Sequence, residues 1–192
     1  MPDAAARLPG WRHWAWSLLI TAALAAGLYA MGRTPVCTCG TVALWHGDPM
    51  SAENSQHLTD WYSPSHVLHG LMFYLALHWL APRMGLGPRL VWATLVEAGW
   101  EFIENTDAMI DRYREVTISL GYYGDSIVNS AMDVAMMWAG FLIAARAPVW
   151  LSVLLFVAAE VIVGLAIRDG LTLNVLMLLW PLEPVKAWQA GG

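Results

Sequence analysis

The feature that most constrains this sequence is the spacing of its charged residues, which leaves long stretches without any. Residues 13–32 contain no Asp, Glu, Lys or Arg, and neither do residues 61–82. A helix of about 20 predominantly apolar residues is long enough to cross the hydrocarbon core of a bilayer. Only 13% of the 192 residues are charged, whereas about 25% is typical of soluble domains. The sequence therefore predicts a small integral membrane protein and not a soluble globular enzyme.

Composition excludes several other classes of protein. The net charge is −5, the isoelectric point is about 5.6, and no basic patch interrupts the chain, which argues against nucleic acid as a partner. A hydrophobic content of 58% excludes an intrinsically disordered chain. The length leaves no room for a large second domain, so a single membrane domain over residues 1–192 is expected.

Apolar stretches of helical length predict an all-α bundle of about six transmembrane helices. The predicted segments are residues 13–32, 64–82, 88–106, 126–145, 148–167 and 170–183. The apolar part of the last segment covers only about 20 Å at 1.5 Å per residue, so it either spans with little tilt or is re-entrant. Two long connections, residues 33–63 and 105–125, are predicted outer loops.

Lys and Arg predict the orientation, because cytoplasmic loops of membrane proteins carry an excess of both. With the N-terminus inside, the inner side holds Arg7, Arg12, Arg83, Arg89, Arg146 and Lys186. The outer side holds Arg33, Arg112, Arg114 and Arg168. Most Trp residues, including Trp180 and Trp188, fall at the predicted inner ends. We therefore expect a multi-pass protein of the bacterial inner membrane with a cytoplasmic N-terminus, whose first segment is an uncleaved anchor or, alternatively, a cleaved signal peptide.

The acidic residues are distributed unevenly in this topology. Of the 15 acids, only Asp3 and Glu183 fall on the predicted inner side. Glu97, Glu101 and Glu104 are spaced i, i+4, i+7 and so share one face of a predicted helix. Ionisable groups inside membrane segments are costly and usually functional. The pattern predicts a polar site that faces outward.

Polar residues from the neighbouring segments reach similar depths. His66 and His69 begin the second segment, and Asp125, Asn129 and Asp133 begin the fourth with spacing i, i+4, i+8. A deeper layer, roughly 12–14 Å from the outer helix ends, comprises Glu97, Asp133 and Glu160. These groups must face one another, a cavity or an ion, although simple interhelical hydrogen bonding is the alternative.

Candidate acid–base residues are the polar groups nearest the outer helix ends. They are His66, His69, Glu101, Glu104, Asp125 and Asn129. Arg112 and Arg114 are candidates to hold an anionic head group of a substrate. The alternative, slightly favoured, is that these two arginines pair with acids nearby in the sequence.

The sequence does not identify a cofactor, and a divalent metal is an open alternative at the same place. The candidate ligands are His66, His69, Glu101 and Asp125. Cys37 and Cys39 lie too close in sequence for a relaxed disulfide, although an oxidising compartment allows one. Two thiols alone are too few for a metal site, so the cysteines receive no catalytic role.

Several stretches resemble an uncharacterised bacterial family of multi-pass membrane proteins. These stretches, within residues 36–188, read LWHG, ENSQHLTDWY, HVLHG, WEFIENTD, RYREVTISL, GYYGDS and IRDGLTLN. The resemblance implies the same kind of membrane protein and carries no established activity.

A more distant resemblance is to VanZ-like membrane proteins, and it implies a VanZ-like core with an outward-facing site. The residues that match their pattern are His66 or His69, the pair Glu101 and Glu104, Arg112 or Arg114, the pair Asp125 and Asn129, and Gly140. Two departures are the absence of an Asp-Lys pair before the histidine and Glu104 where glutamine is common. The resemblance supplies no reaction.

Three functions compete at this point. The first is an outward-facing site that binds or acts on an envelope or lipid-linked substrate, with the lipid bilayer as surroundings. The second is a proton- or ion-coupled transporter, for which the deeper layer is the relevant feature. The third is a non-catalytic envelope assembly or resistance factor. The sequence does not decide between enzyme and binder.

Overall fold

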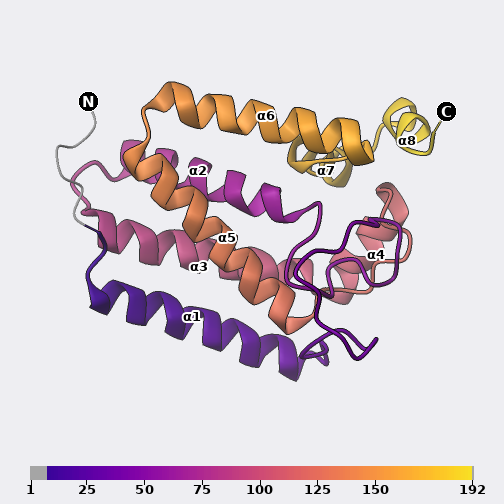
Figure 1. Ribbon diagram of the computed structural model, residues 1–192, viewed down its shortest axis with the longest axis horizontal. Coiled ribbons are helices and arrows are strands. Elements are labelled where there is room, and N and C mark those ends of the chain that lie inside the picture. Colours follow the sequence, from indigo (N-terminus) through magenta and orange to yellow (C-terminus); the bar gives the residue numbers. More distant parts are fainter. Residues whose placement is uncertain (1–7, 192) are drawn as a thin grey trace.

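The structure is a computed structural model that describes residues 8–191, so Asp3 and Arg7 lie outside the described residues. Within that part the chain forms eight helices and no strand, which confirms the all-α class (Figure 1). The helices are α1 (Trp11–Ala30), α2 (Ser63–Leu80), α3 (Leu86–Glu104), α4 (Asp107–Val116), α5 (Ile127–Arg146), α6 (Val149–Ile167), α7 (Leu171–Leu179) and α8 (Glu183–Gln189).

Six of these helices lie at the six predicted segments. The five long ones, α1, α2, α3, α5 and α6, run side by side along the length of the molecule (Figure 1). Three of them, α1, α5 and α6, are long and apolar enough to cross a membrane, judged by length and composition. We call the end that holds residues 31–62, α4, α7 and α8 the mouth end.

The closest helix packing joins α2 to α5 through two glycines. A Cβ atom on Gly140 would lie 2.0 Å from the carbonyl oxygen of Val67, and one on Gly70 would lie 2.1 Å from that of Met137. Only glycine allows two helix backbones to approach so closely. This crossing fixes the first half of α2, with its two histidines, against the second half of α5.

Apolar side chains fill the space between α1, α3 and α5. Leu90, Val134, Met137 and Phe141 are fully buried in one cluster with residues of α1. Thr94 donates to the Ser17 hydroxyl at 3.1 Å and accepts from the Trp138 indole at 2.8 Å. The packing therefore joins α1, α3 and α5 into a tightly filled half.

The predicted outer loop 105–125 contains a helix, α4, that the sequence reading missed. The Thr106 side chain caps it by accepting a hydrogen bond from the backbone N–H of Met109. One face buries Ile110 and Tyr113, while the opposite face carries charged residues. A ten-residue amphipathic helix is too short and too polar to resemble a membrane segment, so apolar length does not reveal it.

The prediction that residues after 183 lie at the same end as the N-terminus is wrong. Helix α7 has nine residues, about 14 Å of helix, and ends just before Pro181. The Lys186 ammonium donates to the Glu115 carbonyl of α4 at 2.8 Å, and α8 lies at the mouth end, opposite the start of α1 (Figure 1). The same prediction placed Trp180, Glu183 and Trp188 at the wrong end of the molecule. Helix α7 fits the re-entrant alternative.

This correction changes the argument for orientation. With Lys186 at the mouth end, both ends of the sequence-based topology carry the same number of Lys and Arg residues. The excess of basic residues that predicted a cytoplasmic N-terminus is therefore gone.

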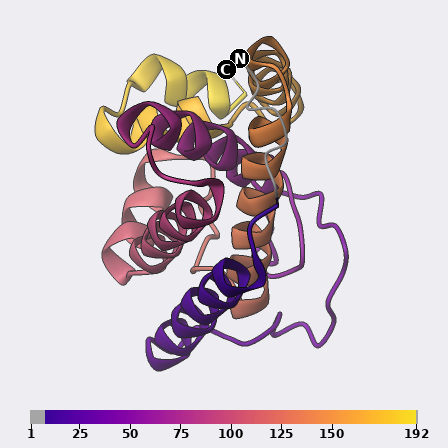
Figure 2. The same cartoon turned by 90° about the vertical axis from the view of Figure 1, so that its left-hand side faces the viewer.

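The connection from α1 to α2 is a long irregular segment that runs beside α5 (Figure 2). The backbone N–H of Ser126 donates to the Ser55 carbonyl at 2.9 Å, and the Asn129 amide donates to the His57 carbonyl at 2.9 Å. These bonds attach the segment to the start of α5, so that Asn54 and Ser55 help to line the mouth end.

Candidate functional site

A cavity of about 580 Å³ lies between α2, α3 and α7 and is bounded at the mouth end by α4 and the adjoining loops. Its polar lining comprises Asn54, Ser55, Asp60, Tyr62, Ser65, His66, His69, Glu104, Tyr113, Ser119, Tyr122, Asp125, Asp133, Thr172 and Asn174. Its apolar lining comprises Met72, Phe73, Val96, Trp100, Phe156, Leu171, Val175 and Leu178. Among the described residues that line it there is no Lys or Arg, so the cavity is an acidic, amphiphilic pocket.

His66 and His69 on α2 both contact Glu97 on α3. His66 Nδ1 lies 2.7 Å from Glu97 Oε1, and His69 Nδ1 lies 3.0 Å from Glu97 Oε2. Since an ionised carboxylate only accepts hydrogen bonds, each Nδ1–H donates to Glu97. This leaves the Nε2 atom of His66 3.8 Å from an oxygen of Asp133 on α5.

Glu101, one turn further along α3, lies fully buried beside this pair. Neither of its carboxylate oxygens has a hydrogen-bond partner within residues 8–191. Its nearest possible donor is His66 Nδ1 at 3.4 Å, and that N–H already points to Glu97. Buried carboxylates without partners are rare in proteins, so this one requires an explanation.

Asp125 immediately precedes the N-cap of α5 and faces the same space. It accepts hydrogen bonds from the Asn105 amide at 2.8 Å and the Tyr122 hydroxyl at 3.0 Å. Burial raises the pKa of Asp125 to about 6, against the lowering effect of these two donors.

Seven residues therefore form one group, which we call the buried cluster: His66, His69, Glu97, Glu101, Glu104, Asp125 and Asp133. Three subsets place one ligating atom from each member within 4.8 Å of the others. They are His66–His69–Glu97, His66–Glu101–Asp133 and Glu101–Glu104–Asp125. Five of the six acid–base candidates from the sequence are in the cluster, and Glu97 and Asp133 join them from the deeper layer.

Asn129, the sixth acid–base candidate, lies outside the buried cluster, and so does Glu160. Asn129 holds the backbone of the 31–62 segment. The carboxylate of Glu160 accepts the backbone N–H groups of Leu171 and Thr172 at 3.0 and 2.9 Å and so caps α7.

Arg112 and Arg114 do not line the cavity. The guanidinium of Arg112 donates to the Leu178 carbonyl at 3.0 Å and lies 3.4 Å from Glu115. That of Arg114 donates to the Tyr122 carbonyl and lies 3.4 Å from Asp111. Both arginines therefore follow the alternative in which they pair within the protein.

Two further buried acids border the mouth of the cavity. Asp60 accepts the backbone N–H groups of Ser55 and Tyr62, and its burial raises its pKa. Asp169, between α6 and α7, accepts from the Tyr62 hydroxyl at 3.1 Å and from the Asn174 amide at 3.0 Å. Asp169 is absent from the candidates of the sequence reading, although its position directly after a long apolar helix is a usable signal.

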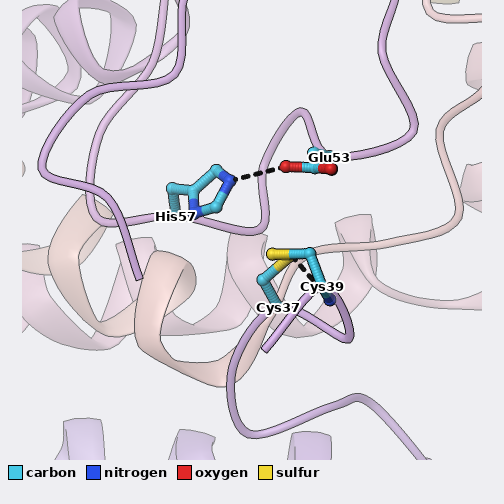
Figure 3. A group of neighbouring side chains, drawn as sticks. All are labelled: Cys37, Cys39, Glu53 and His57. Atoms are coloured by element: carbon cyan, nitrogen blue, oxygen red, sulfur yellow. Dashed lines mark hydrogen bonds and ion pairs between the residues drawn. A yellow bond between two sulfur atoms is a disulfide. The ribbon is translucent and has the colours of Figure 1, made fainter. Parts of the chain in front are cut away.

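A second group of ligand-type side chains lies in the 31–62 segment (Figure 3). Cys37, Cys39, Glu53 and His57, which we call the loop cluster, place one ligating atom each within 4.8 Å of the others. The two cysteines form a disulfide, which is the alternative that an oxidising compartment allows. His57 Nε2 lies 3.2 Å from a Glu53 oxygen, and its Nδ1 accepts the backbone N–H of Ala43. Every member of this cluster has a partner.

Comparison with known proteins identifies the family but no activity. Residues 28–191 match the model of a protein of unknown function, DUF2585. The chain is 59% identical to a UPF0314 protein of Paracoccus denitrificans over 93% of this chain and 92% of that protein. It is 51% identical to a UPF0314 protein of Rhizobium etli over 94% of each chain, and 55% identical to one of Novosphingobium aromaticivorans over 86% of each.

No solved structure matches the chain. The resemblance to VanZ-like proteins is not tested by these comparisons and stays a prediction. The family match covers the helices and loops that build the cavity, including both clusters. The chain therefore belongs to the DUF2585 family, and it is similar over most of its length to UPF0314 proteins.

Proposed function

We propose that this chain is an integral membrane protein whose mouth end faces outward and whose cavity binds a lipid-linked substrate of the cell envelope and acts on its head group. The observation that carries the proposal is the amphiphilic lining of the cavity, in which acids and histidines gather beside an apolar wall. Such a pocket matches an amphiphile with a polar head and an apolar chain.

The membrane part of the proposal is supported by the surface of α6. Its exposed side chains include Trp150, Val157 and Leu165, and Val163 is its only buried residue. A helix that is apolar all round and unburied by its own protein needs an apolar environment, and a bilayer supplies one.

The apolar wall of the cavity continues to the outside of the bundle. Val96 on α3 and Val175 on α7 line the cavity, yet both are about half exposed. An apolar chain that lies between these two helices can therefore reach from the surrounding bilayer to the buried cluster without crossing a polar surface.

The chemistry follows from the environment of His66. Its Nδ1–H donates to Glu97, which fixes the ring and leaves Nε2 as the basic nitrogen. A positioned imidazole of this kind takes a proton from a water or hydroxyl nucleophile and returns it to a leaving oxygen. Hydrolysis or transfer at the head group of the lipid is the reaction class that this arrangement supports.

Lipid retention by the purified protein tests the substrate class. Val175→Trp fills the apolar wall, and Val161→Trp is a matched control because Val161 is similarly exposed but lies on α6 away from the cavity lining. Native mass spectrometry in detergent should detect bound lipid on wild type and on the control, and much less on V175W. Equal lipid occupancy of the two variants would contradict the proposal.

The acid–base role needs a second measurement. His66→Gln keeps the size of the side chain but removes the basic nitrogen, so complementation of a deletion strain should fail although the variant inserts and retains lipid. Full complementation by H66Q would instead favour a non-catalytic binding factor, the third alternative from the sequence.

Transport is the weaker alternative. It relied on a deep layer of three acids, of which Glu160 caps α7 instead of facing the other two. Beyond Asp133, the part of the bundle that the structure describes is filled by Val134, Met137 and Phe141, which are fully buried. If His66→Gln abolished a proton-dependent flux in vesicles, transport would replace the proposed reaction.

The topology has its own test. Five long helices and a re-entrant α7 leave the two termini on opposite sides of the membrane. With the N-terminus in the cytoplasm, a reporter enzyme fused after Gly192 should be active only outside the cytoplasm. A cytoplasmic signal from that fusion would mean that α7 and its flanks cross the bilayer.

A further inference from the structure

We propose that the buried cluster holds two divalent cations that share Glu101 as a ligand. This inference rests on the proposed function for the identity of the substrate, and it changes the role of His66 from acid–base group to metal ligand. The cations would bind whether or not a lipid does. The three observations that carry it are the unpartnered carboxylate of Glu101, the excess of acids around it, and the orientation of His66.

The first observation is the unpartnered carboxylate of Glu101. Glu101 is completely buried, and both of its oxygens lack a hydrogen-bond donor among residues 8–191. Three of its neighbours, Asp133, Glu104 and Asp125, are carboxylates that offer an oxygen within 4.8 Å of it. A cation is the partner that such a carboxylate needs, because removing it from water without one is costly.

The geometry offers two positions for a cation, one on each side of Glu101. The subset His66–Glu101–Asp133 supplies one nitrogen and two oxygens, and the subset Glu101–Glu104–Asp125 supplies three oxygens, each within 4.8 Å. Both oxygens of Glu101 lack a hydrogen-bond partner in the described chain, so neither is already engaged. A bridging carboxylate between two close cations is a recurrent arrangement in hydrolytic and phosphoryl-transfer sites.

The excess of negative charge in the buried cluster also favours bound cations. The buried cluster contains five carboxylates and two histidines, and no Lys or Arg lines the described cavity. Two divalent cations would offset most of that negative charge, which a protein interior does not tolerate uncompensated. Oxygen ligands with one imidazole suit Mn²⁺, Mg²⁺ or Zn²⁺ and not a thiophilic metal such as Cu⁺.

His66 has the orientation of a metal ligand. Its Nδ1–H is held by Glu97 at 2.7 Å, and its Nε2 faces the oxygens of Asp133. Ligating histidines usually donate their other ring N–H to a carboxylate in this way, which fixes the tautomer. Glu97 is therefore a positioning residue, and His66, Glu101 and Asp133 are the ligands of the first cation. In the metal-loaded protein the imidazole would serve as ligand, and the acid–base role would pass to a bound water.

The cations also explain how an acidic cavity accepts a lipid-linked substrate. The two arginines that were candidates for an anionic head group are bound to backbone carbonyls elsewhere. Without cations, no Lys or Arg in the described lining offsets the charge of a phosphate, and the ionisable groups around it are mostly acids. We therefore infer that the head group is anionic, a phosphate or diphosphate, and that it binds through the cations.

Metal titration tests this inference without any lipid. Metal-free protein in detergent is titrated with Mn²⁺ alone, and bound Mn²⁺ is counted by elemental analysis while electron paramagnetic resonance detects coupling between neighbouring ions. Wild type should bind two Mn²⁺ per chain with an exchange-coupled signal. Glu101→Gln should lose both, and Glu104→Gln should keep one, without coupling.

Glu53→Gln in the loop cluster is the matched control and should still bind two ions. Thermal melting of each variant separates lost ligands from lost folding, and Glu104→Gln keeps the test decisive if Glu101→Gln fails to fold. No binding, one ion in wild type, or unchanged binding in Glu101→Gln would overturn the shared-ligand pair. Retained lipid on a protein that binds no Mn²⁺ would leave the lipid cavity standing and remove only the cations.

Discussion

The loop cluster brings four ligand-type side chains within 4.8 Å of one another, and the buried cluster does so in overlapping sets of three, but the two clusters differ in whether those side chains already have partners. In the loop cluster, the cysteines bond to each other and His57 pairs with Glu53 (Figure 3). In the buried cluster, Glu101 has no partner in the part of the chain that the structure describes. The side chains of the loop cluster have their partners within the protein, whereas Glu101 of the buried cluster needs a partner that the protein does not supply.

The difference also concerns exposure. Glu53 and Cys39 are exposed at the surface, where water solvates any unmet charge at little cost. Glu101 and Glu97 are fully buried, where an unmet charge is expensive. Proximity of ligand-type residues is therefore weak evidence for a cation, whereas proximity combined with burial and a missing partner is strong evidence.

The largest expected effect comes from separating the helices that build the buried cluster. Gly140→Ala puts a methyl group against the Val67 carbonyl and should force α2 and α5 apart, at a cost of about 3 kcal/mol or more. Gly99→Ala is the control, since a Cβ there meets nothing within 4 Å. Melting in detergent should fall sharply for G140A alone, and Mn²⁺ binding with it, while mass spectrometry still finds the loop disulfide. Equal melting of both variants would refute the close α2–α5 crossing.

A smaller effect is expected from the residue that orients His66. Glu97→Gln keeps an acceptor near both histidines but removes the charge, so Mn²⁺ affinity should fall roughly 10- to 100-fold with the count unchanged at two. Glu160→Gln is the control, because Glu160 caps α7 away from the cluster. A loss of one ion in E97Q would make Glu97 a direct ligand.

The disulfide of the loop cluster should contribute modestly. Cys37 and Cys39 are two residues apart, and a disulfide that closes so short a loop removes little entropy from the unfolded chain. Replacing both with Ser should lower the melting temperature by a few degrees and leave two bound Mn²⁺. A third ion in the reduced wild type, absent from the Ser variant, would show that the loop cluster is also a metal site. The difference drawn between the loop cluster and the buried cluster would then be wrong.

The smallest effect concerns the pH dependence of stability. Burial raises the pKa of Asp169 to about 6, above its ordinary value of 3.8. The folded state then holds this proton more tightly than the unfolded state, so the contribution of Asp169 to stability is greatest below pH 4 and is lost as the pH rises to 6. The melting temperature of wild type minus that of Asp169→Asn should fall by a few degrees between about pH 4 and 7. A difference that rises with pH would contradict the raised pKa.

Much of the fold was predictable because hydrophobic stretches and helices coincide in this chain. All six predicted segments contain a helix. The return of the chain after α6 was not predictable from apolar length alone, because it depends on Lys186 and Arg112 binding carbonyls of distant segments. The nine-residue run before Pro181 was the only local signal that the last segment is short.

The candidate site was predictable to the level of which helices face one another. Helical spacing brought His66, Glu101 and Asp125 to similar depths, and the structure gathers them. The spacing did not distinguish Asp133, which joins the cluster, from Glu160, which caps α7. The glycine contact holds α5, which carries Asp133, against α2. The sequence does not show this contact, because glycine pairs across helices leave no periodic pattern in hydrophobicity.

The most direct test of the account compares two detergent-like probes of opposite charge, dodecyl phosphate and dodecyltrimethylammonium. Without metal, the acidic cavity should prefer the cationic probe, and with Mn²⁺ the preference should reverse by roughly tenfold or more in wild type but not in Glu101→Gln. Inorganic phosphate without a chain should bind more weakly than dodecyl phosphate. If dodecyl phosphate binds equally well with and without Mn²⁺, the cation-assisted lipid site is wrong.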